Sequence, residues 1–533
     1  MSTSTGTPSS GSGRWGISIE AVPPAVVVLI LAGVRAALRG GARLLSLAVG
    51  VAWRLVASGY VVLALPPDAE CAERTNPDAS RPDVIVVLLD TYRFDHLGVN
   101  AGRSDLTPNL DAFAGEAIRF TRAFSPSNVT SRAMPGVMTS LPASVTGQRL
   151  PEEADLLAEF LQTAGYATLG ISANPNVSKH FGYGQGFDVF LDPTDQADFL
   201  IVNPLQLVSL LLPGPAYAVG IARASFYYPP FDEVRRRARW LLERASRPTF
   251  LYLQTMDLHG PYLPPREYLP DGFALADFYS YYRFSELSGK GVINSPGFAR
   301  HRRNLRQRYE GAVRFSDAEF GRLVEGLRAA GRWDESLVWV LSDHGECFGE
   351  HDHAGHGGLN VTTTLIQVPF LLKLPRSWGV PARAEATPVS TLDLLPTTLG
   401  LLGLEPPEPS FGRDWSDLAR GVPQRDSRTL VSYAASYRRG DGAVTQVYSA
   451  IRWPWKLDLR LPRSGPVTRS LVHLEEDPGE EADLTPSHPE IVASLEAALG
   501  RWRARELELL LGPGTVEIDP RVREQLRNLG YVE

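Results

Sequence analysis

The sequence predicts an α/β fold in which a mostly parallel sheet is covered by helices, with a smaller antiparallel subdomain of α+β type at the C-terminus and a membrane segment at the N-terminus. Three observations support this prediction. Continuous runs of Val, Leu and Ile, such as residues 84–89 and 337–341, are typical of strands buried on both faces. Strand-like runs then alternate with helical patterns, and short strands separated by turns follow from about Arg428. A long apolar stretch precedes all of these elements.

The alternation places each later strand of the main sheet after a helix. We expect the helices at 156–164, 231–245 and 316–330. We expect the strands that follow them at 166–171, 249–254 and 336–341. In the C-terminal part, we expect short strands at 429–433, 446–452, 455–460 and 470–473, before a helix at 489–508. The chain therefore divides into an N-terminal region at 1–80, an α/β domain at 81–425 and a C-terminal subdomain at 426–533.

In the N-terminal region, residues 1–13 are polar and expected to be disordered, and residues 66–82 form a Pro-containing linker. Between them, the stretch at 44–65 is about as long as a bilayer requires. This stretch is preceded by Arg35, Arg39 and Arg43. By the positive-inside rule we expect these arginines to stay in the cytoplasm and the chain after residue 65 to lie on the periplasmic or extracellular side. Arg54 argues against a spanning helix, since a central Arg costs ~2.5–3.5 kcal/mol on insertion scales. There are two alternatives. The region could form a helical hairpin that returns the chain to the cytoplasm, or an amphipathic segment that lies on the membrane surface.

Composition narrows the functional classes. The chain has 533 residues and a net charge of −7 that is spread rather than clustered, with no basic stripe typical of nucleic-acid binders. We therefore expect no nucleic-acid partner. Only two cysteines occur, Cys71 and Cys347, which excludes a disulfide framework and a cysteine-based zinc cluster. Nothing in the sequence indicates an oligomeric state.

Acidic residues follow two of the predicted buried strands. Asp90 comes directly after the run at 84–89, and Asp343 and His344 follow the run at 337–341. In parallel sheets, ligands bind at the carboxyl ends of the strands, so these side chains are expected to meet at one edge. Two carboxylates and an imidazole gathered there favour a divalent cation between them. The alternative is that each Asp caps a following helix.

Histidines are concentrated after the second of these strands. Four of the ten histidines fall within the thirteen residues 344–356, and the density of glycine there indicates a tightly folded loop. A solvated loop that binds metal incidentally is the alternative. His259 follows another buried strand, so it is expected at the same edge, unless it is a capping or structural histidine.

A third feature is the pair Thr130 and Ser131, which are expected at the start of a helix. The N–H groups and dipole at a helix start favour an anion, and a hydroxyl beside a cation can serve as a nucleophile. Taken alone, the pair is better explained as a simple N-cap.

Together these motifs resemble the sulfatase-type members of the alkaline phosphatase superfamily, from about Asp83 to the C-terminus. The segments that carry the resemblance are 89–98, 107–111, the segment that begins at Thr130, 165–168, 257–262, 342–346 with 355–357, and, near the end, 455–457 and 474–480. Each segment is short, but they occur in the order of the family. The resemblance implies an alkaline-phosphatase-like sheet and a catalytic domain at 81–425.

The resemblance also implies roles for individual residues. One divalent metal ion would be held by Asp90, Thr130, Asp343 and His344. The family favours Ca²⁺ for this ion, while Mn²⁺, Zn²⁺ and Mg²⁺ are the alternatives. Thr130 would be the metal-activated nucleophile. The histidines matching the family's other positions, His259 and His356, would contact the transferred group or protonate the leaving oxygen. A second metal is possible if Asp257 gathers with these two histidines.

Two departures from the family pattern matter. Sulfatases carry Cys or Ser in a C/S-x-P-x-R motif that is converted to formylglycine, whereas residues 130–134 here read Thr-Ser-Arg-Ala-Met. We therefore expect no formylglycine. Thr91 stands where many sulfatases have a second metal-binding Asp. The remaining ligand set resembles that of the threonine-nucleophile branches of the superfamily, which act on phosphodiesters and lipid head groups.

The sequence thus predicts a sulfatase-family, metal-dependent hydrolase of sulfate or phosphate esters that is anchored to the membrane. One alternative is a membrane-anchored phosphodiesterase or lipid head-group phosphotransferase. Another alternative is a non-catalytic binding protein with a sulfatase-like fold. The complete set of metal ligands argues against this alternative. The substrate itself depends on loops such as 199–222 and 271–303, whose composition does not indicate it.

Overall fold

The computed structural model describes residues 81–194, 228–246, 248–260, 262, 264–269, 293–424, 428–437, 444–462 and 464–509. Its central element is an eight-stranded sheet with the order β11-β2-β10-β7-β1-β6-β4-β5. Neighbouring strands are parallel except where β10 pairs with β2 and with β7. The strands of this large sheet are β1 (Val84–Leu89), β2 (Ile118–Phe120), β4 (Ala167–Ser172), β5 (Val189–Leu191), β6 (Thr249–Thr255), β7 (Leu337–Leu341), β10 (Phe370–Lys373) and β11 (Arg383–Glu385).

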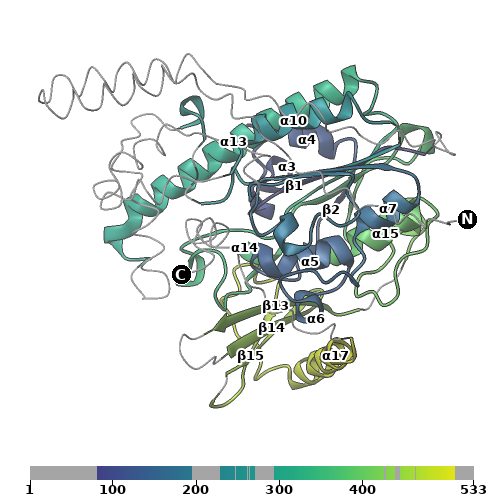
Figure 1. The fold of residues 1–533 in the computed structure, drawn as a ribbon. Helices are drawn as coiled ribbons and strands as arrows, with labels where there is room; N and C mark the ends of the chain where they lie inside the picture. The colour runs from purple at the N-terminus through teal and green to yellow at the C-terminus, as the bar shows by residue number, and fades with distance from the viewer. Residues whose placement is uncertain are drawn as a thin grey trace, which may run out of the picture.

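The large sheet is buried on both faces. Every residue of β1 is buried, with odd-numbered side chains in one hydrophobic cluster and even-numbered side chains in another. This alternation follows from the two-residue period of a strand and explains why the sequence reads as a continuous apolar run. Helices α10 (Phe231–Leu242) and α13 (Ala299–Ala329) cover the first face, and α5 (Thr130–Thr139), α7 (Leu157–Thr163) and α15 (Leu394–Leu401) cover the second (Figure 1).

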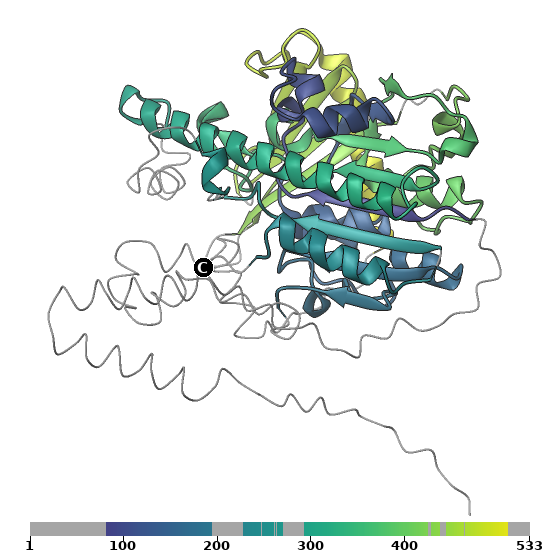
Figure 2. The same cartoon turned by 90° about the horizontal axis from the view of Figure 1, so that it is seen from above.

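A second, antiparallel sheet lies beside the large one and has the order β13-β14-β15-β16. Its strands are β13 (Leu430–Tyr437), β14 (Val444–Arg452), β15 (Trp455–Leu461) and β16 (Thr468–His473). Helix α17 (Pro489–Glu508) packs on this small sheet through Val492, Leu495 and Leu499. Seen from above, α13 runs along the large sheet and extends past it (Figure 2).

Several short elements connect these layers. In the described ranges, the other helices of four residues or more are α3 (Gly98–Ala101), α4 (Pro108–Ala114), α6 (Ala143–Thr146), α14 (Thr363–Ile366) and α16 (Ser416–Ala419). The other strands in these ranges are β3 (Ala123–Phe124), which pairs with β12 (Val389–Ser390), and β8 (Cys347–Phe348), which pairs with β9 (Ala354–Gly355).

The small sheet is joined to the large domain just before α5. Ser127 forms an isolated parallel bridge with Tyr433 of β13, and the Ser127 hydroxyl donates to the Tyr433 carbonyl at 2.7 Å. The Tyr433 N–H donates to the Pro126 carbonyl at 2.8 Å. The Ser432 hydroxyl donates to the Ser125 carbonyl at 2.5 Å. Strand β13 therefore holds the loop that leads into α5.

The structure confirms the mostly parallel sheet, the antiparallel C-terminal sheet and the helix at 489–508. The predicted start of the helix at 316–330 was wrong, because α13 begins at Ala299. The first part of α13 is rich in arginine and carries few buried apolar residues, so its hydrophobic period is weak.

The predicted membrane segment at 44–65 lies outside the described residues, as does the apolar stretch at 199–222. Within the part of the chain that the structure describes, no helix is both long and apolar enough to cross a membrane.

A buried ion pair stabilises the small sheet. The Lys456 ammonium is 1% exposed and donates to Asp458 at 2.7 Å and to Glu480 at 2.6 Å. Burial by itself lowers the pKa of Lys456, but the two carboxylates outweigh it and raise the pKa to about 12. Glu480 also accepts the N–H of Thr363 at the start of α14. The pair therefore connects β15 to the large domain.

Replacing Lys456 by Met is expected to lower the free energy of unfolding by about 3–5 kcal/mol, because Glu480 is then left buried without its cation. Urea denaturation measures the loss. The matched control is Arg469→Met, which breaks a partly exposed pair with Glu496 and is expected to cost under about 1 kcal/mol. Equal losses in the two variants would contradict the importance of the buried pair.

Asp257, just after β6, is a buried carboxyl group that faces α10. Its Oδ2 accepts the N–H of Phe231, the first residue of α10, at 3.0 Å. Burial raises the pKa of Asp257 to about 8, and nearby Asp232 contributes to the rise. Because the folded state holds a proton that the unfolded state releases near pH 4, this residue makes the protein less stable as the pH rises from about 4 to 8.

Asp257→Asn should remove this pH dependence while keeping a hydrogen-bond acceptor for Phe231. We expect the free energy of unfolding of the wild type, relative to the variant, to fall by up to about 1.4 kcal/mol per pH unit between pH 5 and 8. Thermal or chemical denaturation across this range measures the difference. Parallel pH profiles for the two proteins would contradict a protonated Asp257.

Candidate active site

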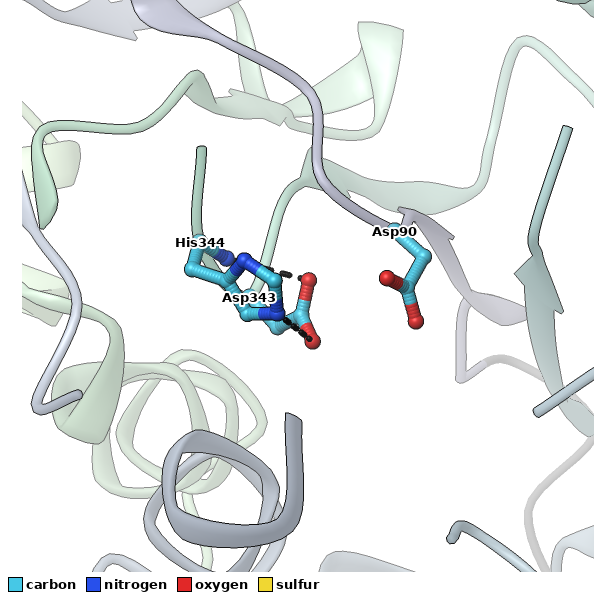
Figure 3. Close-up of side chains that lie close together, drawn as sticks. All are labelled: Asp90, Asp343 and His344. Atoms are coloured by element: carbon cyan, nitrogen blue, oxygen red, sulfur yellow. Dashed lines mark hydrogen bonds and ion pairs between the residues drawn. The ribbon is translucent and has the colours of Figure 1, made fainter. Parts of the chain in front are cut away.

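The two acidic strand ends meet because β1 and β7 are adjacent and parallel. Leu88 of β1 pairs with Leu341 of β7, so Asp90 and Asp343 leave the sheet at the same edge. Thr91 then adopts a φ of 59°, an uncommon conformation for a β-branched residue, which turns the chain away from the strand. Figure 3 shows Asp90 facing the Asp343 and His344 side chains across a small gap.

Asp90, Asp343 and His344 form a candidate metal centre. Each offers one ligand atom, all three atoms lie within 4.8 Å of one another, and all three residues are fully buried. Asp90 Oδ1 and Asp343 Oδ2 have no hydrogen-bond partner in the described structure. Buried carboxylate oxygens without donors are costly, and a divalent cation would satisfy both. The residues therefore fit a metal ion with oxygen and nitrogen ligands.

Electrostatics support this reading of the centre. Burial raises the pKa of the Asp90 carboxyl well above its usual range, and the charge of Asp343 raises it further. A cation held between the two groups reverses both effects by favouring their charged forms. Carboxylate and imidazole ligands suit several divalent metals, so the donor set does not select one of them.

Each carboxylate is held in place by hydrogen bonds to one of its oxygens. Asp90 Oδ2 accepts hydrogen bonds from the side-chain amides of Asn174 at 2.7 Å and Gln254 at 3.0 Å. Asp343 Oδ1 accepts the backbone N–H groups of His344 at 3.0 Å and Thr91 at 3.3 Å. One oxygen of each group is thus occupied and the other faces the centre, which is the arrangement a metal ligand needs.

The loop that carries His344 is fixed by close backbone packing. The Gly345 N–H donates to the Leu365 carbonyl at 2.7 Å, and a Cβ on Gly345 would come within 2.1 Å of the Thr364 carbonyl oxygen. No other residue fits at this position. His344 Nδ1 lies 2.9 Å from the Gly345 carbonyl, which can only accept, so Nδ1 carries the proton and Nε2 faces the centre.

Thr130 brings a hydroxyl to the same centre. It is the first residue of α5 and is fully buried. Its Oγ1 lies 3.2 Å from His344 Nε2, 3.4 Å from Asp90 Oδ2 and 3.4 Å from the Asn174 amide nitrogen. Val129 provides no side-chain cap, so the N-terminus of α5 remains suited to an oxyanion. The predicted fourth ligand therefore lies beside the other three.

The two predicted histidines lie next to this group. The ring centroid of His356 is 4.5 Å from that of His344 and 4.8 Å from that of His259. His356 Nδ1 lies 3.2 Å from Glu346 Oε1, and His259 Nδ1 donates to the Gly260 carbonyl at 2.9 Å. The structure thus brings together all six residues that the sequence predicted for the site.

Burial controls the protonation of these groups. Burial lowers the pKa of His259 to about 3, and the neighbouring His356 lowers it further. Burial also lowers the pKa of His356 well below its usual range, and the neighbouring His344 adds to this effect. Burial also raises the pKa of Glu346 to about 7. Both imidazoles are therefore neutral near pH 7, and in the bonded tautomer of His259 the lone pair is on Nε2.

The hypothesis of a second metal required Asp257 to gather with these histidines. The Asp257 carboxylate instead accepts the N–H of Phe231 and faces α10. In the described residues, the only group of three or more His, Cys, Asp or Glu ligands with metal-like spacing is Asp90, Asp343 and His344.

The sequence did not single out Asn174, Gln254 or Glu346 as site residues. Gln254 carried a usable signal, because a polar side chain inside an apolar, fully buried strand must find a hydrogen-bond partner. Asn174 lies in a loop after β4, where asparagine is common, and its contact with Asp90 spans 84 positions of sequence.

Comparisons with known proteins identify the family of the chain. A family model described as Sulfatase matches residues 82–404. The ulvan-active sulfatase of Formosa agariphila is 27% identical over 385 residues, which cover 68% of this chain and 70% of that protein. A multifunctional alkaline phosphatase superfamily protein of Trinickia caryophylli is 25% identical over 430 residues, which cover 67% of this chain and 81% of that protein.

Among solved structures, the fold is similar to that of a phosphonate monoester hydrolase of Agrobacterium radiobacter. The TM-score is 0.62 at 20% identity, and the match covers 80% of this chain and 96% of that one. The likeness at this identity is one of fold. Since the family model spans more than half of the chain and contains the whole candidate site, the protein belongs to the sulfatase family of ester hydrolases.

Proposed function

We propose that the protein hydrolyses phosphate or sulfate esters in a metal-dependent reaction in which Thr130 is the nucleophile. The observation that carries this proposal is the position of Thr130 Oγ1, which lies 3.4 Å from Asp90 and 3.2 Å from His344 at the candidate metal centre. By the resemblance to the family, residues 130–134 correspond to the formylglycine segment of sulfatases, and threonine cannot give that aldehyde.

Asp90, Asp343 and His344 would hold the cation, and Thr130 would complete the ligand set. A bound divalent cation would supply positive charge, which lowers the pKa of a nearby hydroxyl and polarises an ester oxygen. Asn174 and Gln254 would keep Asp90 aimed at the centre. The N-terminus of α5 would stabilise negative charge on the oxygens of the group being transferred.

The reaction would then proceed in two steps. Thr130 Oγ1 attacks the phosphorus or sulfur atom, the bond to the leaving alcohol breaks, and the hydroxyl proton is ultimately transferred to that alcohol. Water then cleaves the threonyl ester and restores the hydroxyl. His259, which is neutral and carries its lone pair on Nε2, is suited to accept a proton from this water, with His356 beside it.

The choice between sulfate and phosphate follows from the nucleophile. The sequence of residues 130–134 predicts no formylglycine, the group on which sulfatases depend, and a simple threonine resembles the nucleophile of the phosphodiester-cleaving branches. A relative described as a multifunctional alkaline phosphatase superfamily protein is consistent with chemistry beyond sulfate. We therefore propose phosphate esters, diesters included, as the preferred substrates.

Residues 44–65 support a proposal about location. Their apolar composition and the three arginines before them favour a membrane anchor that exports the rest of the chain. We propose that the enzyme acts on the periplasmic or extracellular side of a membrane. Labelling of engineered single cysteines in intact cells, at positions before and after this stretch, tests the orientation.

Thr130→Ala is expected to reduce turnover about a thousandfold or more on an aryl phosphate monoester, an aryl phosphodiester or an aryl sulfate, whichever the wild type cleaves. The assay is run with added Ca²⁺, Mn²⁺, Zn²⁺ or Mg²⁺. The matched control is Ser131→Ala at the next position, which should retain activity. Wild-type turnover in Thr130→Ala would exclude this nucleophile, and sulfate turnover alone would contradict the preference for phosphate.

Removal of the metal should destabilise the wild type, because a ligand at 100 times its Kd contributes about 2.7 kcal/mol. Thermal denaturation with and without EDTA measures the change. In Asp343→Asn the melting temperature should no longer respond to EDTA. That variant should also be at least as stable as the metal-free wild type, since one of two repelling buried carboxylates has been removed. An equal response of both proteins to EDTA would contradict this metal site.

A further inference from the structure

A cavity lies where α17 and the small sheet meet the large domain near Phe411. Its volume is about 310 Å³, within the range of small-molecule sites. Four of the described residues that line it are arginines, namely Arg428, Arg452, Arg501 and Arg505, and two are aromatic, Phe411 and Trp502. None of its eight lining residues is an aspartate or glutamate.

The cavity is separate from the catalytic centre. The backbone N–H of Phe411 donates to the carbonyl of Ser140, which follows the last residue of α5, at 2.9 Å. Thr130 is at the opposite end of this ten-residue helix, which corresponds to about 15 Å along its axis. The cavity and the candidate active site therefore lie toward opposite ends of α5.

One of the four guanidinium groups is already neutralised. Arg428 makes two hydrogen bonds to the Asp393 carboxylate, one of them at 2.9 Å. That carboxylate also accepts the indole N–H of Trp415 at 2.8 Å and the backbone N–H of Arg413 at 2.8 Å. Asp393 thus joins α15 to the segment before β13. Within the described residues, no ion pair involves Arg452, Arg501 or Arg505.

The remaining arginines are positioned but bind only neutral groups in the contacts seen here. Arg452 donates to the hydroxyls of Ser494 at 2.8 Å and Thr429 at 2.9 Å, while its buried Nε has no hydrogen-bond partner in the described structure. Arg505 donates to the Ser410 carbonyl at 2.7 Å and stacks over the Phe411 ring at 4.8 Å. Arg501 lies one helical turn before Arg505 on the same face of α17.

We propose that this cavity is a second anion-binding site that takes a tetrahedral oxyanion, sulfate or phosphate, either free or carried on a longer polyanionic molecule. Three like charges around one cavity repel one another, and an oxyanion between them removes the repulsion. Guanidinium groups match the geometry of such oxyanions through paired N–H donors. The stacking of Arg505 and the neutral partners of Arg452 hold two of the donors in place before binding.

The test compares the full-length wild type with the double variant Arg501→Gln and Arg505→Gln. Both arginines are exposed, so the variant should fold. The matched control is Arg503→Gln, which removes a charge from the same helix at a residue that stacks over Tyr448 of the small sheet instead. Isothermal titration calorimetry with inorganic sulfate, inorganic phosphate and a heparin tetrasaccharide measures the binding. Any oxyanion bound at the active site contributes equally to all three proteins.

We expect the double variant to bind at least one of these probes about tenfold more weakly than the wild type, with Arg503→Gln unchanged, since a hydrogen bond to a charged group contributes about 1.5–3 kcal/mol. A loss for inorganic sulfate or phosphate identifies a free anion as sufficient. A loss for the tetrasaccharide alone identifies a carried oxyanion. Equal binding by all three proteins, or equal losses in the double variant and the control, would overturn the proposal. The measurement needs no turnover, so it does not depend on the proposed function.

Discussion

The repulsion between two buried carboxylates is the constraint on which the site depends. Asp90 and Asp343 extend from neighbouring parallel strands, fully buried, with one oxygen of each facing the other group. The fold places them there because β1 and β7 are paired in register along their whole length. Such a pair is unfavourable without a cation, so the sheet topology that brings the two carboxylates together also defines the candidate metal centre.

The surrounding polar groups are organised around the same constraint. Two side-chain amides hold Asp90, and two backbone N–H groups hold Asp343, so neither carboxylate can rotate away without losing hydrogen bonds. Thr130 lies within 3.4 Å of this group because the loop before α5 is fixed by β13. The position of Thr130, the proposed nucleophile, is therefore set by both sheets, whereas Asp90, Asp343 and His344 follow strands of the large sheet alone.

Much of this arrangement was predictable because it follows from periodicity and position. Continuous apolar runs marked β1 and β7, and Asp90, Asp343 and His344 were visible as polar residues at their ends. Asn174 could not be found in this way, since its contact with Asp90 depends on how one loop folds over the sheet. The start of α13 was missed for a related reason. Its arginine-rich first turns are held by tertiary contacts, such as that of Arg308 with the Tyr262 carbonyl, rather than by an apolar stripe.

The bridge between Ser127 and Tyr433 has a consequence for the gene. Every candidate catalytic residue lies before residue 357, so a nonsense mutation at the codon for Asp426 would leave all of them in the translated product. That product would lack β13, whose hydrogen bonds hold residues 125–127 just ahead of Thr130. It would also lack Glu480, which accepts the N–H of Thr363. A truncated allele of this kind would keep the active-site sequence intact and still be a null allele.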